Sequence, residues 1–230
     1  MATLAKPGGS AVDRKLVKRW IQLMAGLFGC GLAVALMIRS RLGLGPWDAF
    51  HVGLHRITGL TVGTVSILVG VAILFGTWFL GVRPGLGTLV NMVMIGVFMD
   101  LLLLVTPEAG GILTAFVYYG AGIIVFGLAT GMYLGAGLGS GPRDGLMIAV
   151  SEIRGLSVRR VRTFIELAVL VAGWLMGAQV GIGTIVFALT IGPATQWGMQ
   201  LAGVTVHPRA ASSAAIAEAA RNSTGDRRVA

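Results

Sequence analysis

Gly43-Leu44-Gly45-Pro46-Trp47-Asp48 is a six-residue motif that returns in this chain as Gly139-Ser140-Gly141-Pro142-Arg143-Asp144. The second copy follows the first by 96 positions, and the same offset aligns further residues without a gap: Gly59-Leu60 with Gly155-Leu156, Trp78 with Trp174, and Thr88 with Thr184. A match that keeps one register over such a length indicates an internal duplication. The chain is therefore predicted to consist of two copies of one unit.

The composition is that of a membrane protein. Of the 230 residues, 55% are hydrophobic and only 12% are charged, and the mean hydropathy is +0.85. The formal net charge is +9, but the basic residues flank apolar runs, where they determine topology, so we expect no nucleic-acid partner. A lone cysteine, Cys30, excludes an internal disulfide and a cysteine metal cage. We expect neither a cofactor nor a metal site.

Six apolar runs are long enough to cross a bilayer as helices: residues 20–38, 62–80, 86–105, 111–134, 163–179 and 184–205. The predicted fold class is an all-α membrane protein with about six transmembrane helices in two repeats. The predicted organisation is a cytoplasmic N-terminal segment at 1–19, a first membrane repeat at 20–110, a second at 111–205, and a flexible cytoplasmic tail at 206–230.

The distribution of basic residues predicts that both termini lie in the cytoplasm, because six crossings leave only Arg39, Arg41 and Arg56 outside. Eight crossings would move Arg159, Arg160 and Arg162 to the outer side, so six is preferred. Three crossings per unit make the second unit enter the membrane from the opposite face. This pattern predicts inverted-topology repeats, as in many secondary transporters, with each motif opening a short re-entrant half-helix.

The chemistry of the motif follows from its order of residues. A proline suits the first position of a helix, and an aspartate two residues later falls in the first turn, near free N–H groups and the positive end of the helix dipole. Asp48 and Asp144 are thus interpreted either as caps or as ligands in a polar pathway. Trp47 and Arg143 occupy the same motif position, which favours an aromatic wall opposite a fixed cation. Arg143 is equally well explained as a cytoplasmic topology charge.

Other polar residues fall within or beside the apolar runs. Asn91 and Asp100 lie in the third run, and Glu166 lies near the start of the fifth, where a helical salt bridge to Arg162 is the simpler explanation. His51 and His55 are four residues apart, which fits a proton or metal pair, but a third ligand with suitable spacing is missing. For these histidines we expect an interfacial position.

Three further stretches carry a family resemblance: Leu42 to Asp48, Gly59 to Thr64, and Arg83-Pro84-Gly85-Leu86-Gly87-Thr88. In these motifs the chain resembles the YczE/YitT-like group of bacterial membrane proteins, from about Trp20 to Gly203. The resemblance implies a multi-pass protein of the bacterial cytoplasmic membrane. It implies no particular substrate, and the soluble C-terminal domain of some YitT relatives has no counterpart here.

The sequence leads to two functional hypotheses. In the first, the protein is a small-solute or ion transporter or permease whose site lies between the two half-helices, with substrate-binding residues Trp47, Asp48, His51, Arg143 and Asp144. Asn91, Asp100 and Glu166 are then candidates for coupling or for a polar pathway. In the second, it is a non-transporting scaffold or regulatory subunit of other membrane complexes. No nucleophile or catalytic motif is recognisable, so an enzyme is not expected. The expected partners are the lipid bilayer, a small solute or ion, and a second copy of the chain in a homodimer.

Overall fold

The computed structural model describes residues 9–80, 85–139 and 141–203, and within these ranges the chain forms eight α-helices. Four belong to the first repeat: α1 (Gly9–Ser40), α2 (Pro46–Thr58), α3 (Val62–Phe79) and α4 (Leu86–Val105). Four belong to the second: α5 (Ile112–Gly135), α6 (Pro142–Arg154), α7 (Val158–Leu175) and α8 (Ile182–Leu201). The all-helical fold class is confirmed.

The duplication is reproduced in the helix boundaries. The first and last residues of α6, α7 and α8 each lie 96 positions after those of α2, α3 and α4. The punctuation between the helices is repeated as well, because Gly59 and Gly155 both end a short helix in the left-handed conformation. Thr61 and Ser157 then cap the next helices by accepting a hydrogen bond from a backbone N–H three residues later.

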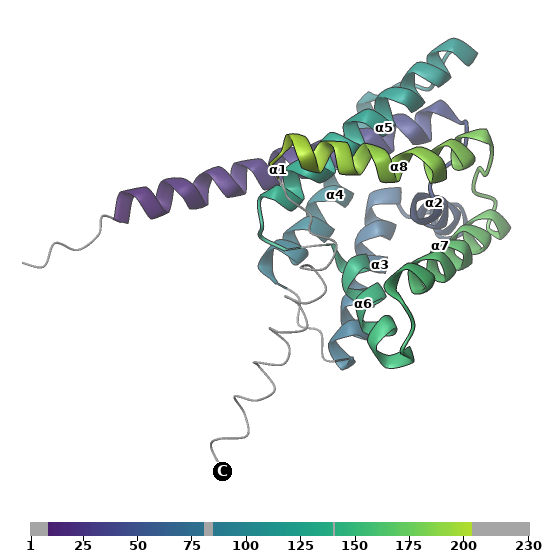
Figure 1. The fold of residues 1–230 in the computed structure, drawn as a ribbon. Helices are drawn as coiled ribbons and strands as arrows, with labels where there is room; N and C mark the ends of the chain where they lie inside the picture. Colours follow the sequence, from purple (N-terminus) through teal and green to yellow (C-terminus); the bar gives the residue numbers. More distant parts are fainter. Residues whose placement is uncertain (1–8, 81–84, 140, 204–230) are drawn as a thin grey trace, which may run out of the picture.

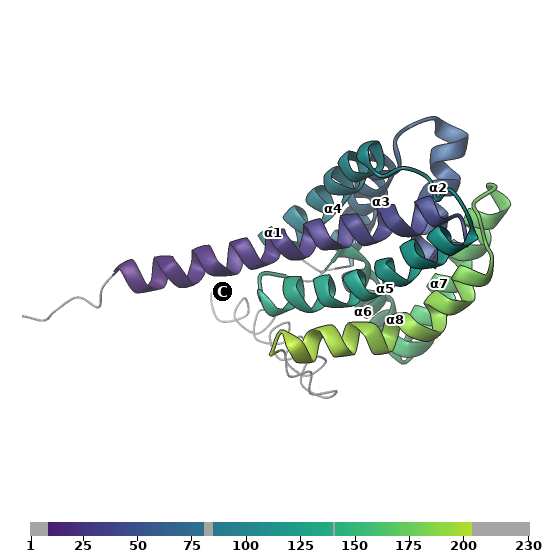
Figure 2. The same cartoon turned by 90° about the horizontal axis from the view of Figure 1, so that it is seen from above.

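The helices form two groups. In the first, α4 packs on α1, α1 on α5, and α5 on α8; Figure 2 shows the last three lying alongside one another. In the second, α2 packs on α7 and α3 on α6, so each short motif helix is held by a helix of the other repeat. Helix α3 also packs on α4, which joins the two groups. The N-terminal half of α1 extends beyond the rest of the bundle (Figure 1). One apolar core cluster lies around Ala33 and Met37 of α1, which are 0% and 1% exposed.

Contacts between the repeats are reciprocal at the motif glycines. Gly43 has a φ of +125°, and a Cβ there would lie 2.8 Å from Thr184 Oγ1. Gly139 has a φ of +139°, and a Cβ there would lie 2.9 Å from Thr88 Oγ1. Both pairs combine a left-handed backbone with a close approach that only glycine tolerates. Gly139 corresponds to Gly43, and Thr184 corresponds to Thr88. In each repeat, therefore, the motif glycine contacts the equivalent threonine of the other repeat.

The outer surface of the bundle is apolar. Large hydrophobic side chains such as Phe75, Phe79, Leu104, Leu113 and Leu189 are 66 to 83% exposed. By length and hydropathy, four helical segments can cross a membrane: Arg14–Ser40, Val62–Phe79, Leu86–Val105 and Ile112–Gly135. The predicted fifth and sixth spans also form helices, but α7 carries three arginines and a glutamate, and α8 carries Gln196 and Gln200. These polar residues lower the mean hydropathy of α7 and α8.

Several predicted boundaries differ from the structure. The first helix begins at Gly9 instead of Trp20, because no helix breaker lies between Ser10 and Arg19. The fifth predicted span ends at Leu175 instead of Gln179, since Gly177 adopts a φ of +87°. Helix α8 runs continuously through Pro193. The predicted tail at 206–230 lies outside the described residues, as do Arg83 and Pro84 of the third stretch that carries the family resemblance.

Candidate functional site

The two motif helices begin as the sequence predicts. Pro46 and Pro142 are the first residues of α2 and α6, each after an extended glycine. Proline lacks the N–H that a first helical residue leaves unpaired, and its φ is already helical. Asp48 and Asp144 consequently lie in the first turns. The local sequence thus sets where each helix starts, and the packing of α2 on α7 and of α3 on α6 places both starts inside the bundle.

A cavity of about 120 Å³ lies between the starts of the two motif helices. Its polar lining brings together Asp48 and His51 from α2, Asn91 from α4, and Arg143 and Asp144 from α6. Cys30 and Tyr133 add a thiol and a phenol, and residues such as Val69, Ile73 and Phe126 form apolar walls. Four of the five predicted substrate-binding residues, together with Asn91, therefore line one cavity. Its volume suits a few water molecules or a small ion better than a drug-sized ligand.

Trp47, the fifth predicted residue, supports the cavity from outside its lining. The guanidinium carbon of Arg143 lies 4.9 Å from the centroid of the Trp47 ring, within the range of a cation–π contact. Trp47 is itself 8% exposed. The Trp47 ring thus faces the guanidinium of Arg143, the residue that occupies the same position in the second copy of the motif.

The two aspartates lie in the first turns of their helices, where a carboxylate meets free N–H groups, and both line the cavity. Asp48 is 8% exposed and lines the cavity, and among the described residues it makes no side-chain hydrogen bond. The dipole at the start of α2 therefore faces a carboxylate that retains its acceptor capacity.

Two other polar side chains around the cavity are buried without a partner. His51 Nε2 and Asn91 Nδ2 make no hydrogen bond within the described part of the chain, and these residues are 1% and 4% exposed. Buried polar atoms without a partner cost roughly 1–3 kcal/mol each, so a site of this kind favours water or a ligand. His51 thus lies inside the protein, on the short helix α2 that packs against α7.

Asp100 and Glu166 lie away from the cavity. The Asp100 carboxylate accepts hydrogen bonds from the Thr61 hydroxyl at 2.5 Å and from the Gly63 N–H at 2.7 Å, which ties α4 to the start of α3. Glu166 pairs with Arg162 at 2.8 Å on the exposed side of α7, as the simpler explanation of its spacing predicts. Each carboxylate already has a structural partner.

Sequence reasoning missed the contributions of Tyr133 and Cys30 to the cavity. Tyr133 is one of few polar side chains in a run of apolar residues and glycines, which is a usable signal, whereas the neighbours of Cys30 in the sequence do not distinguish it from a packing residue. In the described ranges no three His, Cys, Asp or Glu residues are grouped closely enough to hold a metal ion. His51 and His55 therefore do not form part of such a cluster there.

Comparison with known proteins adds the family. Residues 17–200 match a family of unknown function, DUF6198. The chain belongs to this family. It is 40% identical to a Bacillus subtilis protein described as uncharacterized membrane protein YczE, over 79% of this chain and 85% of the relative. The YczE-like resemblance is thereby confirmed.

Two other relatives are less similar. The chain is 32% identical to an uncharacterized protein of Haemophilus influenzae, over 78% of this chain and 82% of the relative. It is 30% identical to the Bacillus subtilis protein YyaS, over 70% and 82% respectively. No solved structure matches. With a named membrane protein among its relatives and an apolar helical surface, this DUF6198 member is a membrane protein.

Proposed function

We propose that this DUF6198 member is a transporter or permease for a small ion or solute, with its site in the cavity between the two motif helices. The observation that carries the proposal is that both repeats contribute charged residues, Asp48 from one and Arg143 and Asp144 from the other, to one interior cavity. Charged groups at such depth in a membrane protein are costly and usually mark a pathway.

The arrangement of the repeats supports the proposal. Each repeat supplies three long helices and one short one. The contact between Gly43 and Thr184 has an equivalent between Gly139 and Thr88. Such reciprocity is expected of two units related by a two-fold axis in the membrane plane, the arrangement of inverted-repeat transporters. In this proposal the protein spans the bacterial cytoplasmic membrane six times, with both termini in the cytoplasm.

The charges around the cavity suggest what is bound there. Asp48 and Asp144 supply two carboxylates, and Arg143 supplies one guanidinium. Arg162 and Glu166 are not part of the cavity lining, and they form an ion pair with each other that adds no net charge. An uncompensated negative charge is unfavourable in a low-dielectric interior, so one positive charge, a proton or a small cation, balances the site. The small volume of the cavity agrees with this assignment.

Currents measured on a solid-supported membrane test the proposal. Proteoliposomes holding the purified protein are exposed to concentration jumps of H⁺, Na⁺, K⁺ and NH₄⁺, and then of small neutral and anionic solutes. We expect a current for at least one cation that falls to background in Asp48→Asn and Asp144→Asn. Glu166→Gln serves as the matched control, because it removes a carboxylate outside the cavity, and it should keep the current.

The outcome also separates the two hypotheses. Folded protein that passes no ion or solute above empty liposomes would contradict transport and favour a scaffold or regulatory subunit. An equal loss of current in Glu166→Gln would contradict the assignment of the site to the cavity.

A further inference from the structure

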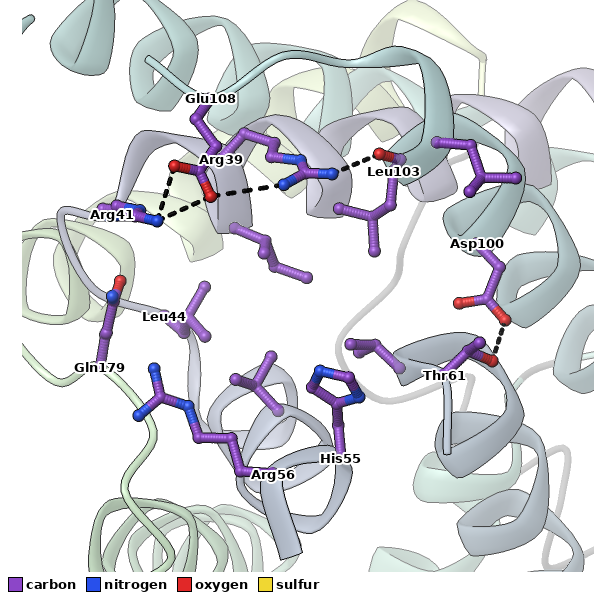
Figure 3. Close-up of a pocket in the computed structure, with 14 residues that line it drawn as sticks. Arg39, Arg41, Leu44, His55, Arg56, Thr61, Asp100, Leu103, Glu108 and Gln179 are labelled. Atoms are coloured by element: carbon purple, nitrogen blue, oxygen red, sulfur yellow. Dashed lines mark hydrogen bonds and ion pairs between the residues drawn. The ribbon is translucent and has the colours of Figure 1, made fainter. Parts of the chain in front are cut away.

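A second, larger pocket lies at the other end of α2, where α1 ends and α3 begins. Its volume is about 420 Å³, and Figure 3 shows charged and polar side chains arranged around an open centre. The apolar part of its lining includes Leu44, Val52, Val62 and Leu103. Among the described residues, Leu44 is the one motif residue in its lining, and the pocket shares no lining residue with the interior cavity, so its chemistry requires a separate explanation.

Positive charge is in excess around the pocket. Arg39 and Arg41 share one carboxylate, Glu108, at 3.6 and 2.6 Å. Arg56 lies on the opposite side, where its guanidinium donates to the carbonyl of Gly177. Asp100, the other carboxylate in the lining, is occupied by Thr61 and Gly63. Three guanidinium groups therefore face two carboxylates that already have partners.

The arginines retain donors for a ligand. A guanidinium carries five N–H groups, and each of these arginines uses only some of them. Arg39 donates from one terminal nitrogen to the carbonyl of Leu103 at 2.5 Å, while its buried Nε has no partner among the described residues. A forked donor of this kind matches the two oxygens of a carboxylate or the oxygens of a phosphate.

The internal duplication shows that the fold does not require these charges. At the equivalent positions of the second repeat, Arg39 is replaced by Gly135, Arg41 by Gly137, and Arg56 by Glu152. Helices α6 and α7 nevertheless begin and end 96 positions after α2 and α3, and α5 ends one residue before the position that corresponds to the end of α1. The basic residues are thus a property of this pocket alone, and a binding role explains them better than a structural one.

We propose that this pocket binds an amphipathic anion, with its charged group between Arg39, Arg41 and Arg56 and its apolar body along Leu44, Val52, Val62 and Leu103. A free carboxylate with a short aliphatic chain and the head-group region of an anionic lipid share this chemistry. The site is separate from the interior cavity, so it does not depend on the transport proposal.

Octanoate is a suitable probe because it combines one carboxylate with a short apolar chain. Its binding to the full-length protein in nanodiscs of neutral phosphatidylcholine is measured by equilibrium dialysis, with protein-free nanodiscs subtracted. Arg41→Gln and Arg56→Gln should each weaken binding by about tenfold, since each removes a charge-assisted contact. Arg159→Gln, an exposed arginine of α7 outside the pocket, makes the same charge change and should leave binding unaltered.

Further ligands and lipids define the result that would overturn the proposal. Octylamine and octan-1-ol should bind at least about tenfold more weakly than octanoate, because neither offers an anion to the arginines. Equal binding of octan-1-ol, or unchanged octanoate affinity in both arginine variants, would refute an anion site. Nanodiscs containing phosphatidylglycerol distinguish the two sources: competition with octanoate identifies a lipid head group, and unchanged octanoate binding identifies a free carboxylate.

Discussion

Arg143 and Trp47, which occupy the same position of the repeated motif, are in contact: the guanidinium carbon of one lies 4.9 Å from the ring centroid of the other. Residues at equivalent positions touch only where the two repeats meet. The starts of α2 and α6 therefore face each other, and the cavity next to this contact is lined by both. Because one repeat has an indole at this position and the other a guanidinium, the two equivalent side chains are complementary and form a cation–π contact.

The Trp47–Arg143 contact should be measurable as stability. Trp47→Phe keeps a ring under the guanidinium and should cost less than Trp47→Leu, which removes the π face. The difference should be about 0.5–2 kcal/mol, the range of cation–π interactions. Thermal unfolding in detergent measures it, and the same pair in an Arg143→Gln background should show a smaller difference. An undiminished difference in that background would show that Trp47 acts by packing alone.

Charge balance in the cavity predicts that a substitution in α2 partly restores the stability that a substitution in α6 removes. Arg143→Gln leaves two carboxylates without their cation and should destabilise the protein, by less than the roughly 3–5 kcal/mol of a fully buried pair because Arg143 is only partly buried. Adding Asp48→Asn to Arg143→Gln should recover part of the loss, since it removes one of the unbalanced charges. Chemical unfolding of both variants and of Asp48→Asn completes the double-mutant cycle. Strictly additive losses would contradict the electrostatic coupling.

The reciprocal glycine contacts predict a graded series of alanine substitutions. Gly43→Ala combines a left-handed φ with a Cβ 2.8 Å from Thr184 Oγ1 and should cost about 2 kcal/mol or more. Gly59→Ala has a left-handed φ but open space, and should cost about 1 kcal/mol. Gly110→Ala has neither constraint and should change stability by less than about 0.5 kcal/mol. Thermal unfolding of the three variants tests the order, and a reversed order would show that packing at the motif is loose.

The two carboxylates outside the cavity should affect stability by different amounts. Asp100→Asn weakens charge-assisted bonds to Thr61 and Gly63 and should cost about 1–2 kcal/mol. Glu166→Gln breaks an exposed i,i+4 pair and should cost at most about 0.5 kcal/mol. Unfolding measurements in detergent separate the two. A transport defect in Asp100→Asn without loss of stability would instead support the role in coupling or a polar pathway for which the sequence makes Asp100 a candidate.

The orientation of the repeats can be tested at equivalent exposed residues. Ile57 and Ile153 lie in the last turns of α2 and α6 and are 65% and 59% exposed, so a cysteine at either site should be accessible. In a Cys30→Ala background, inverted repeats predict that a membrane-impermeant maleimide added to intact cells labels Ile57→Cys and not Ile153→Cys. Labelling of both sites from the same side would contradict the inverted topology.

Much of the fold was predictable because its signals are local. Proline at the first helical position, glycine in the left-handed conformation and a threonine or serine cap each act within one turn, so the starts and ends of α2, α3, α6 and α7 follow from adjacent residues. The start of α1 was missed because hydropathy marks where a helix enters an apolar environment, which differs from where the helix begins.

The sequence by itself determined the membrane environment, the duplication and the two motif helices, since composition, a constant offset and nearest-neighbour chemistry are all readable along one chain. Only the tertiary structure decided which polar residues meet. It brought Asp48, His51, Asn91, Arg143 and Asp144 to one cavity, and it assigned Asp100 and Glu166 to other partners. It also assembled three arginines around a second pocket. These juxtapositions depend on how α2 packs on α7 and α3 on α6, which is a property of contacts between residues about a hundred positions apart.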